Sequence, residues 1–531
     1  MGLTTTTKVD NTDRAAVPKF VAALIEVVSI LAALGFSHLV AGLLAPGSSP
    51  FQAVADAVVR LSPPALTEFG KSLDFPAIGL PRGVADKALL LVGVALVILV
   101  VAVLAGIAAR RRRLPGVLVI GVLGVVGLAA VVVSPVFTPI GVVAPVVALV
   151  VGLGAFSGLY RLATRSAAAV DGGGVSRRGV LLSTAAVGVG AVGAGLGGFL
   201  LGGATGSRES LVGRLRPALP APPVPAGADF ASVGTPAFIT ANRDFYRIDV
   251  ALRIPEQAAS DWSMRIHGMV DRELRLTYAD LLARPLLEKT ITITCVSNEV
   301  NGDLISTSNF IGVSLRDLLL EAGVRQGAEQ IFSTSIDGWT AGTPTDVVMA
   351  PDSEALLAIG MNGQPLPPEH GFPVRMVVPG LYGFVSATKW LADLELTTFA
   401  AKQSYWLRRG WAERAPIKTE CRIDKPGGFE TLTPGPNGKV TLAGIAWAQT
   451  RGIEKVELRL DDTGPWLPVQ LGTQVNLQTW RMWRYDTKLA PGSHFVQCRA
   501  TDATGAVQTM ERAKPIPDGA SGWPGISFSV A

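Results

Sequence analysis

Residues 290–298 read TITITCVSN, and this stretch gives the clearest structural signal in the chain. Threonine and isoleucine alternate strictly from 290 to 294, a pattern that predicts a half-buried β-strand. Cys295 follows at once and opens a polar loop that contains Gly302. A thiolate at a strand end can ligate a soft metal or act as a nucleophile, whereas a single cysteine taken alone is more often a small buried hydrophobe.

The chain has 531 residues, with three cysteines and four histidines. So few cysteines and histidines exclude zinc-finger and iron–sulfur proteins, whose ligands cluster at short spacing. The length predicts two or three folding units. In an oxidising compartment Cys421 and Cys498 can pair and leave Cys295 as the odd thiol, but the sequence alone does not establish their geometry.

Five apolar segments are long enough to cross the hydrocarbon core of a bilayer, which takes about 20 helical residues. They are residues 18–45, 88–109, 116–134, 141–160 and 179–201. We therefore predict a membrane region of five transmembrane helices at residues 17–203. A cytoplasmic tail at residues 1–16 precedes it.

Lysines and arginines set the orientation of these segments, because positively charged loops stay in the cytoplasm. They lie before or at the first span, between spans two and three, and between spans four and five: Lys8, Arg14 and Lys19; Arg110 to Arg113; and Arg161, Arg165, Arg177 and Arg178. Five crossings then place everything after the last span outside the cytoplasm. Because much of the net charge of +5 lies in these clusters, we expect no nucleic-acid partner.

Two ionisable residues inside the first span, Glu26 and His38, are functional candidates. The alternative is that neighbouring helices shelter Glu26 and that His38 lies near the outer interface. Bis-histidine haem binding within this chain is excluded, because His38 is the one histidine in a span. The run SRRGVLL at 176–182 resembles a twin-arginine export signal, with ordinary positive-inside flanking as the alternative.

A linker rich in proline and alanine, residues 204–236, separates the spans from a soluble half. Residues 237–412 mix strands, turns and a short amphipathic helix at 313–320, which indicates an α+β domain. Residues 413–531 read as all-β and predict a β-sandwich of immunoglobulin type. Its expected strands are residues 440–448, 455–460 and 495–501.

Several stretches of the soluble half resemble the sulfite oxidase family of molybdenum enzymes. Residues 292–298 are similar to the family's cysteine loop, where the thiolate binds molybdenum. HGFPVR at 370–375, with VPG at 378–380 and KWL at 389–391, is similar to its pterin-binding segment. The last domain resembles its molybdenum-cofactor dimerisation domain, so a homodimer is among the expected assemblies. The resemblance implies a sulfite-oxidase-type molybdopterin domain that binds the molybdenum–molybdopterin cofactor (Moco).

The resemblance also implies roles for single residues. Cys295 would ligate molybdenum; Tyr405, at the domain junction, and Arg481, which matches an arginine that reaches the anion pocket, would be catalytic with it. The expected cofactor-binding residues are Asn242, Arg243, Tyr246, Cys295, Ser297, Asn298, His370, Arg375 and Lys389. Among them, His370 and Arg375 would offer charge-assisted donors to the pterin phosphate.

These roles have plainer alternatives in the residues alone. Arg375 would otherwise be a strand-edge salt-bridge residue, Lys389 a surface lysine, and residues 242–247 a solvated edge. Two neighbouring tryptophans could simply stack on Arg481.

One departure from the family bears on the substrate. Sulfite-oxidising relatives carry two arginines after the loop asparagine, where this chain has Glu299 and Val300. Without those cations the attraction for a small dianion falls. A neutral sulfoxide or another oxygen-atom acceptor is therefore at least as good a candidate as sulfite.

We accordingly expect a membrane-anchored, molybdopterin-dependent oxidoreductase that performs two-electron or oxygen-atom-transfer chemistry outside the cytoplasm. Its electrons would pass to or from a separate partner, a quinone or a cytochrome, because the chain has no recognisable haem or iron–sulfur motif. Sulfoxide-reductase-like activity with a membrane electron donor is one alternative. A non-catalytic, membrane-tethered binding protein on the same fold is another, and the few intramembrane polar residues argue against a transporter.

Overall fold

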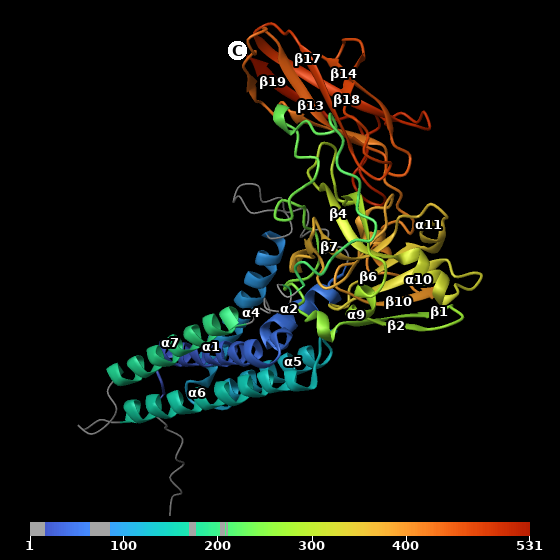
Figure 1. The fold of residues 1–531 in the computed structure, drawn as a ribbon. Coiled ribbons are helices and arrows are strands. Elements are labelled where there is room, and N and C mark those ends of the chain that lie inside the picture. Colours follow the sequence, from blue (N-terminus) through green and yellow to red (C-terminus); the bar gives the residue numbers. More distant parts are fainter. Residues whose placement is uncertain (1–15, 64–84, 169–176, 202–207, 209–210) are drawn as a thin grey trace, which may run out of the picture. The chain divides into compact units, whose positions relative to one another are not determined.

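The structure, a computed structural model, describes residues 16–63, 85–168, 177–201, 208 and 211–531. The chain divides into two compact units, residues 1–203 with 250–254, and residues 204–249 with 255–531 (Figure 1). The described part of the first unit is helical, and the described strands all lie in the second. Several predicted features lie outside the described residues: nearly all of the N-terminal tail with Lys8 and Arg14, and Ser176 at the start of the export-signal run.

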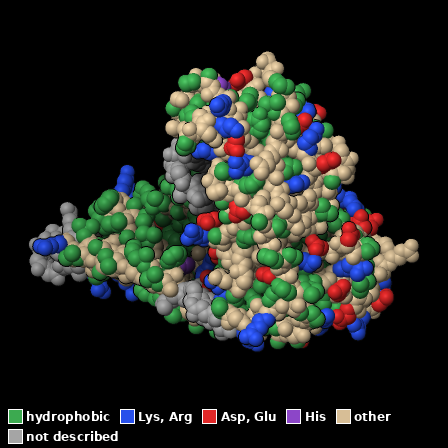
Figure 2. All heavy atoms as spheres, turned by 45° about the horizontal axis from the view of Figure 1, so that its top comes forward, with side chains coloured by type: hydrophobic (Ala, Val, Ile, Leu, Met, Phe, Trp, Pro, Cys, Tyr) green, Lys and Arg blue, Asp and Glu red, His purple; other side chains and the backbone are tan. Residues whose placement is uncertain are grey.

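Five helices of the first unit are long and apolar enough to cross a membrane. They are α1 (Lys19–Leu44), α4 (Ala85–Ala109), α5 (Leu114–Val132), α6 (Val143–Ala168) and α7 (Arg177–Leu201). Each overlaps a predicted span, and hydrophobic side chains cover much of this unit's surface (Figure 2). Helix α6 continues past residue 160, so Arg161 and Arg165 lie in its last turns and not in a loop, because no glycine or proline interrupts residues 161–168.

The loop after the first span contains a helix that the sequence reading did not predict. Helix α2 (Pro50–Leu61) follows the short turn η1 (Pro46–Ser48), and η3 (Pro139–Val142) leads into α6 in the same way. Pro50 occupies the first turn of α2, where its missing N–H costs nothing. With 12 residues, α2 is too short to cross a bilayer.

Helix α1 packs against α4, α6 and α7. Small residues allow the close approach, since a Cβ on Gly42 would lie 2.5 Å from the carbonyl oxygen of Gly198. Glu26 is fully buried in this bundle, so the prediction that neighbouring helices shelter it is confirmed. His38 Nδ1 lies 3.1 Å from the hydroxyl of Ser49, immediately before α2.

The second unit begins with two sheets. One is mixed, with strand order β2-β1-β10-β5-β6; the other is antiparallel, with order β3-β4-β7-β8 and with β9 beside β7. Their strands are β1 (Ser263–Gly268), β2 (Leu274–Thr277), β3 (Leu287–Thr294), β4 (Ile305–Ser314), β5 (Gln330–Ser335), β6 (Thr340–Pro344), β7 (Leu356–Met361), β8 (Gln364–Pro365), β9 (Arg375–Val377) and β10 (Leu391–Thr397).

Short helices join these strands. They are α9 (Tyr278–Leu282), α10 (Leu315–Ala322), α11 (Thr345–Met349) and α12 (Gly383–Ser386). The helix expected at residues 313–320 is α10, displaced by two residues because Ser314 caps it. The Ser314 hydroxyl accepts a hydrogen bond from the N–H of Asp317 at 3.2 Å.

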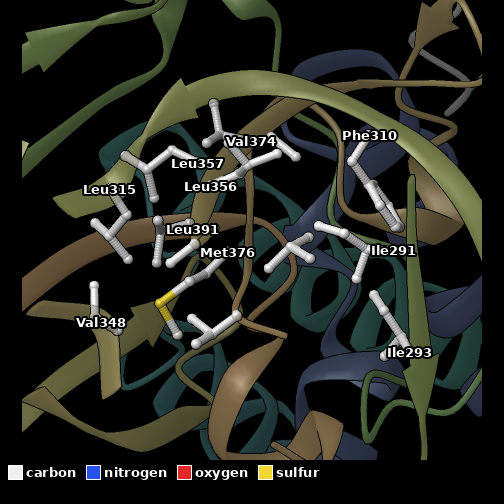
Figure 3. Close-up of a cluster of buried hydrophobic side chains, with 14 of the residues drawn as sticks. Ile291, Ile293, Phe310, Leu315, Val348, Leu356, Leu357, Val374, Met376 and Leu391 are labelled. Carbon is white, nitrogen blue, oxygen red and sulfur yellow. The ribbon is translucent and has the colours of Figure 1, made fainter. Parts of the chain in front are cut away.

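A shared hydrophobic core fixes the position of β3. Ile291 and Ile293 contribute to a cluster with Phe310 on β4 and with residues of β7, β9 and β10 (Figure 3). Burying each such side chain contributes about 1.5–3 kcal/mol to folding stability. Slipping the strand by one residue would turn several of these side chains to the other face and lose that stabilisation.

The predicted strand at 290–294 is confirmed, but the expectation that it is half-buried is wrong. All five of its residues are buried. A loop of the C-terminal domain covers the threonine face: Thr292 N–H donates to the carbonyl of Gln478 at 3.0 Å, and Trp480 N–H donates to the Thr292 hydroxyl at 2.8 Å.

The C-terminal part contains two further sheets, with orders β11-β13-β17-β16 and β12-β19-β18-β14-β15. Residues from both form a second hydrophobic core. The strands expected at 440–448, 455–460 and 495–501 are confirmed as β13, β14 and β18. The strands are β11 (Glu420–Lys425), β12 (Thr431–Leu432), β13 (Val440–Trp447), β14 (Ile453–Leu460), β15 (Leu467–Pro468), β16 (Gln470–Leu471), β17 (Arg481–Thr487), β18 (Gly492–Asp502) and β19 (Gly525–Val530).

Candidate molybdopterin site

Cys295 lies where β3 ends. Its N–H donates to the carbonyl of Leu304 at 2.9 Å, which extends the pairing of β3 with β4 by one residue. Its carbonyl accepts from the N–H of Asn298 at 3.0 Å, so the chain turns directly after the strand. The residue is only 8% exposed. Sheet pairing on one side and a tight turn on the other therefore hold the thiol in a buried, fixed position.

Asn298 shapes the loop that follows. Its Oδ1 accepts from the N–H of Leu304 at 2.9 Å, whereas its buried Nδ2 has no hydrogen-bond partner among the described residues. Gly302 leaves room for this amide, since a Cβ there would lie 2.6 Å from Asn298 Oδ1. An unsatisfied buried donor costs about 1–3 kcal/mol, so Nδ2 is a candidate donor to a bound group. Ser297 is half-buried in the same loop.

Strand β11 of the C-terminal domain fastens the far side of this loop. Asn301 Oδ1 accepts from the N–H of Ile423 at 2.8 Å, and Arg422 donates to the carbonyl of Gly302 at 3.0 Å. The C-terminal domain therefore helps to build the cysteine loop.

Tyr246 lies beside the end of β3. A Cβ on Gly383 would be 3.7 Å from both the Tyr246 hydroxyl and the carbonyl oxygen of Thr294, so both groups border the same residue, Gly383 at the start of α12. Burial raises the pKa of Tyr246 well above its usual value; the charge of Cys295 raises it further and that of Arg375 opposes the shift. The phenol is therefore protonated at neutral pH and can donate a hydrogen bond.

Arg375 is a buried cation at the start of β9. It is 4% exposed, and its Nη1 donates to the carbonyl of His370 at 3.2 Å. Its Nε is buried with no hydrogen-bond partner, and no carboxylate pairs with this guanidinium among the described residues. Burial lowers its pKa to about 10, which leaves it charged at neutral pH. A buried, uncompensated cation is costly, and a bound anion would remove that cost.

His370 does not offer the charged donor that we expected. Burial and the charges of Arg375 and Lys389 lower its pKa to about 4, so the imidazole is neutral at neutral pH. Its Nε2 lies 2.9 Å from the carbonyl oxygen of Asn242. Because a carbonyl can only accept, Nε2 carries the proton. The ring also meets Phe245 edge-on, with centroids 5.3 Å apart.

Lys389 forms a buried ion pair. Its Nζ donates to Asp249 Oδ2 at 2.8 Å and to the carbonyl of Glu369 at 3.1 Å, and the two paired side chains are 11% and 6% exposed. Burial lowers the pKa of Lys389 to about 8, against the opposing effect of Asp249. Asp249 also accepts from Arg247 Nε at 2.8 Å. Lys389 is thus already compensated, whereas Arg375 is not.

Asn242 and Arg243 occupy different environments. Asn242 is held at the end of β7: its Nδ2 donates to the carbonyl of Met361 at 3.3 Å and its Oδ1 accepts from Asn362 at 2.8 Å. The Arg243 side chain is 87% exposed and pairs with Asp244 at 3.4 Å. The solvated-edge alternative therefore holds for Arg243.

Tyr405 and Arg481, both expected to be catalytic, lie in different surroundings. Tyr405 is buried at the junction, with the Arg409 guanidinium 3.7 Å from its ring centroid. Arg481 donates to the carbonyls of Gly472 and Ile453, each at 2.8 Å. Both acceptors belong to the C-terminal domain, and the catalytic role expected for Arg481 stays a prediction.

The sequence reading missed four titratable residues around the site, Asp249, Asp337, Tyr382 and Glu420. Burial raises the pKa of Asp337 and Tyr382, and that of Glu420 to about 8. Cys295 contributes to the shift at Tyr382, so these two residues interact electrostatically. None lies in a stretch that we matched to the family; the Asp-Gly turn at 337–338 was the one local signal.

Comparison with known proteins gives a consistent result. The family model described as the oxidoreductase molybdopterin binding domain matches residues 251–406. The uncharacterized oxidoreductase YuiH of Bacillus subtilis is 36% identical over 153 residues, which are 29% of this chain and 73% of YuiH. Sulfite oxidase of Gallus gallus is 28% identical over 320 residues, 51% of this chain and 68% of that protein.

Two further matches complete the comparison. Mitochondrial sulfite oxidase of Homo sapiens is 28% identical, and the match spans 50% of this chain and 57% of the human protein. Among solved structures, the sulfane dehydrogenase SoxCD from Paracoccus pantotrophus shares 24% identity at a TM-score of 0.45, over 52% of this chain and 75% of that chain.

The sequence matches agree with the buried cysteine and arginine on the class of protein. The soluble unit is that of a molybdopterin-binding oxidoreductase, and the chain is an enzyme whose cofactor is Moco. Within that class, the chain belongs to the sulfite oxidase family.

Proposed function

We propose that this enzyme is anchored in the membrane and carries out two-electron, oxygen-atom-transfer chemistry on a small substrate outside the cytoplasm, with Cys295 as the protein ligand of molybdenum. The observation that carries the proposal is that one site contains both a buried thiol, Cys295, and a buried cation, Arg375, that has no carboxylate partner among the described residues. Both act on the pKa of Tyr246, so the three side chains share one electrostatic environment.

The residues present fit the cofactor. A pterin phosphate would give Arg375 the anion that its buried Nε and its charge lack. The unpartnered Nδ2 of Asn298 offers a further donor, and a thiolate at Cys295 suits a soft metal. When bound, the cofactor supplies the metal centre that exchanges electrons and an oxygen atom with the substrate.

The protein's own contribution is to hold groups and exclude water. Tyr246 keeps its phenolic proton at neutral pH, so its hydroxyl can donate a hydrogen bond beside Cys295. Tyr405 keeps its proton in the same way, because burial raises its pKa. Burial of this region strengthens each of these electrostatic interactions relative to water.

A neutral substrate is at least as good a candidate as a small dianion. The loop after Cys295 presents an exposed Glu299 and a half-buried Val300, neither of which attracts an anion. We propose that Arg375 serves the cofactor, which leaves the loop itself without a cation for the substrate. Sulfoxides and N-oxides, as neutral oxygen-atom acceptors, therefore rank at least level with sulfite.

The proposed orientation rests on the positive residues flanking the helices. Arg110 to Arg113 join α4 to α5, and Arg161 and Arg165 lie at the end of α6. Because positive residues favour the cytoplasmic side, we propose that these ends are cytoplasmic and that the soluble unit lies outside. Ser493→Cys, on exposed backbone of β18, should react with a membrane-impermeant maleimide in intact cells. Ser166→Cys should react only after permeabilisation, and the reverse pattern would overturn the orientation.

The strand orders support an immunoglobulin-type C-terminal domain. The order β11-β13-β17-β16 corresponds to the A-B-E-D sheet of that fold, and β19-β18-β14 to G-F-C. By its resemblance to a dimerisation domain, this domain is the proposed contact in a homodimer. Electrons would pass to or from a separate quinone or cytochrome.

The decisive experiment is metal analysis followed by a substrate screen. The purified chain should contain molybdenum and reduce or oxidise one of sulfite, sulfoxides and N-oxides with an artificial electron carrier. Cys295→Ser should lower turnover more than about 100-fold while keeping the thermal unfolding midpoint. Full turnover in that variant would contradict the assigned ligand, and a chain without molybdenum would support a non-catalytic binding protein.

A further inference from the structure

Two cysteines far apart in the sequence meet between the sheets of the C-terminal domain. Cys421 lies on β11 and Cys498 on β18, strands that belong to opposite sheets. Their Sγ atoms are 2.8 Å apart. A disulfide bond is about 2.05 Å long, so a shift of about 0.8 Å would bring the sulfur atoms to bonding distance.

Strand pairing holds both residues in place. Cys421 is in register with Ala446 on β13, and Cys498 with Leu458 on β14. Their exposures are 2% and 0%, and both belong to the hydrophobic core of this domain. Each cysteine therefore lies on a strand that is paired within its own sheet, and the two sheets face each other. The contact between the cysteines does not depend on a loop.

The polar neighbour of the pair tolerates oxidation. As a thiol, Cys421 donates to Gln508 Oε1 at 3.1 Å. The same oxygen accepts from the N–H of Ala500 at 3.1 Å, and the amide nitrogen donates to the carbonyl of Gly522 at 2.9 Å. Loss of the thiol hydrogen therefore leaves no side-chain atom of Gln508 unsatisfied.

We propose that Cys421 and Cys498 form an inter-sheet disulfide in the mature protein. The two thiols lose two protons and two electrons as the S–S bond forms. The oxidant is a disulfide-bearing thiol oxidoreductase of the extracytoplasmic compartment, whose own disulfide is reduced to a dithiol by exchange. Cys295 takes no part, so the catalytic thiol stays reduced.

Burial shields the pair from exchange once the domain has folded, since both cysteines are almost fully covered. Burial raises the pKa of the Cys421 thiol well above its usual value, and the adjacent Cys498 raises it further. Because the thiolate is the reactive species, the folded pair exchanges slowly. The finished bond therefore resists reduction.

Peptide mapping of the full chain, isolated from its own membranes, tests the proposal. The sample is blocked with N-ethylmaleimide without reduction and digested with trypsin. Residues 419–422 (TECR) and 489–499 (LAPGSHFVQCR) should appear as one linked peptide that lacks two hydrogen atoms and separates on reduction. Recovery of both peptides singly blocked by maleimide would overturn the proposal.

Two variants complete the experiment. Cys421→Ser should release residues 489–499 as a blocked peptide and lower the thermal unfolding midpoint by about 5–10 °C, whereas Cys295→Ser should retain the linked peptide. A linked peptide that persists in Cys421→Ser would refute the pairing.

Molybdenum content of the same preparation keeps this inference separate from the proposed function. If molybdenum-loaded protein yields Cys421 and Cys498 as two blocked thiols, only the disulfide proposal is contradicted. If the linked peptide is found in protein that cannot be loaded with molybdenum, the disulfide is supported and only the enzyme assignment is contradicted.

Discussion

At the scale of single residues, three basic side chains of the candidate site differ because their partners differ. Lys389 has the carboxylate of Asp249, and His370 is neutral and bonds a carbonyl. Among the described residues, Arg375 has a carbonyl and the ring of Phe310 but no carboxylate. Arg375 is therefore the group that binding an anion would relieve most. The unpaired charge of Arg375 lowers the stability of the cofactor-free protein, and it contributes to binding when the cofactor is present.

Replacing Arg375 should thus have opposite effects on stability and on loading. Arg375→Met removes an uncompensated buried charge, so the cofactor-free protein should gain about 1–3 kcal/mol in free energy of unfolding. The same change should lower cofactor affinity roughly 10–100-fold, because a charge-assisted hydrogen bond contributes about 1.5–3 kcal/mol. Metal analysis and urea unfolding measure the two effects.

Arg243→Met is the matched control, because the Arg243 side chain is 87% exposed. It should change neither quantity. Destabilised cofactor-free Arg375→Met protein with unchanged molybdenum content would show that the guanidinium is a structural group.

Val300 offers a second test at this scale. Val300→Arg places a cation in the loop after Cys295, and should lower KM for sulfite about 10-fold through attraction of roughly 1.4 kcal/mol. KM for a neutral sulfoxide should stay unchanged. Val300→Met, of similar length but uncharged, is the control; equal KM values for Arg and Met variants would place the substrate elsewhere.

At the scale of elements, β11 joins the two parts of the soluble unit. Its residues Arg422 and Ile423 hold the cysteine loop, and Cys421 faces β18. Glu420 begins the strand, 5% exposed, with Oε1 unpartnered among the described residues. The strand thus carries a buried acid between the site and the second core.

Glu420 should make stability depend on pH. Burial raises its pKa from 4.5 to about 8, so the folded state holds one more proton than the unfolded state between these values. The associated stability is full below about pH 4.5 and is lost as the pH rises through about 8, at most about 5 kcal/mol. Thermal unfolding at pH 5, 7 and 9 measures the decline.

Glu420→Gln should flatten this decline and leave the variant more stable than the parent chain at pH 9. Glu413→Gln, which changes an exposed carboxylate, should keep the parental profile. A Glu420→Gln profile that still follows the parent would assign the pH dependence to other groups.

At the scale of the whole molecule, the two compact units separate anchoring from chemistry. Every residue proposed to hold the cofactor belongs to the second unit. Leu211 and Leu215, at 4% and 8% exposure, belong to the core of that unit, so the linker is already part of its fold there.

A chain of residues 208–531 should therefore fold without the spans, bind molybdenum and turn over substrate with an artificial electron carrier. A chain that begins at Asp229 lacks Leu211 and Leu215 and should lose about 2–5 kcal/mol of stability for each buried leucine removed. Inactive but folded and loaded 208–531 protein would mean that the membrane helices contribute to the reaction.

The sequence alone determined the five spans, the strand that ends at Cys295 and the strands of the C-terminal domain. It could do so because hydropathy, alternation and turn residues are local properties. Only the tertiary structure decided that Arg375 has no counter-ion among the described residues, that Lys389 has Asp249, that Arg481 bonds two carbonyls of its own domain and that β3 is covered on both faces. Charge compensation and burial depend on contacts between segments that are far apart in the sequence, and no local sequence pattern predicts those contacts.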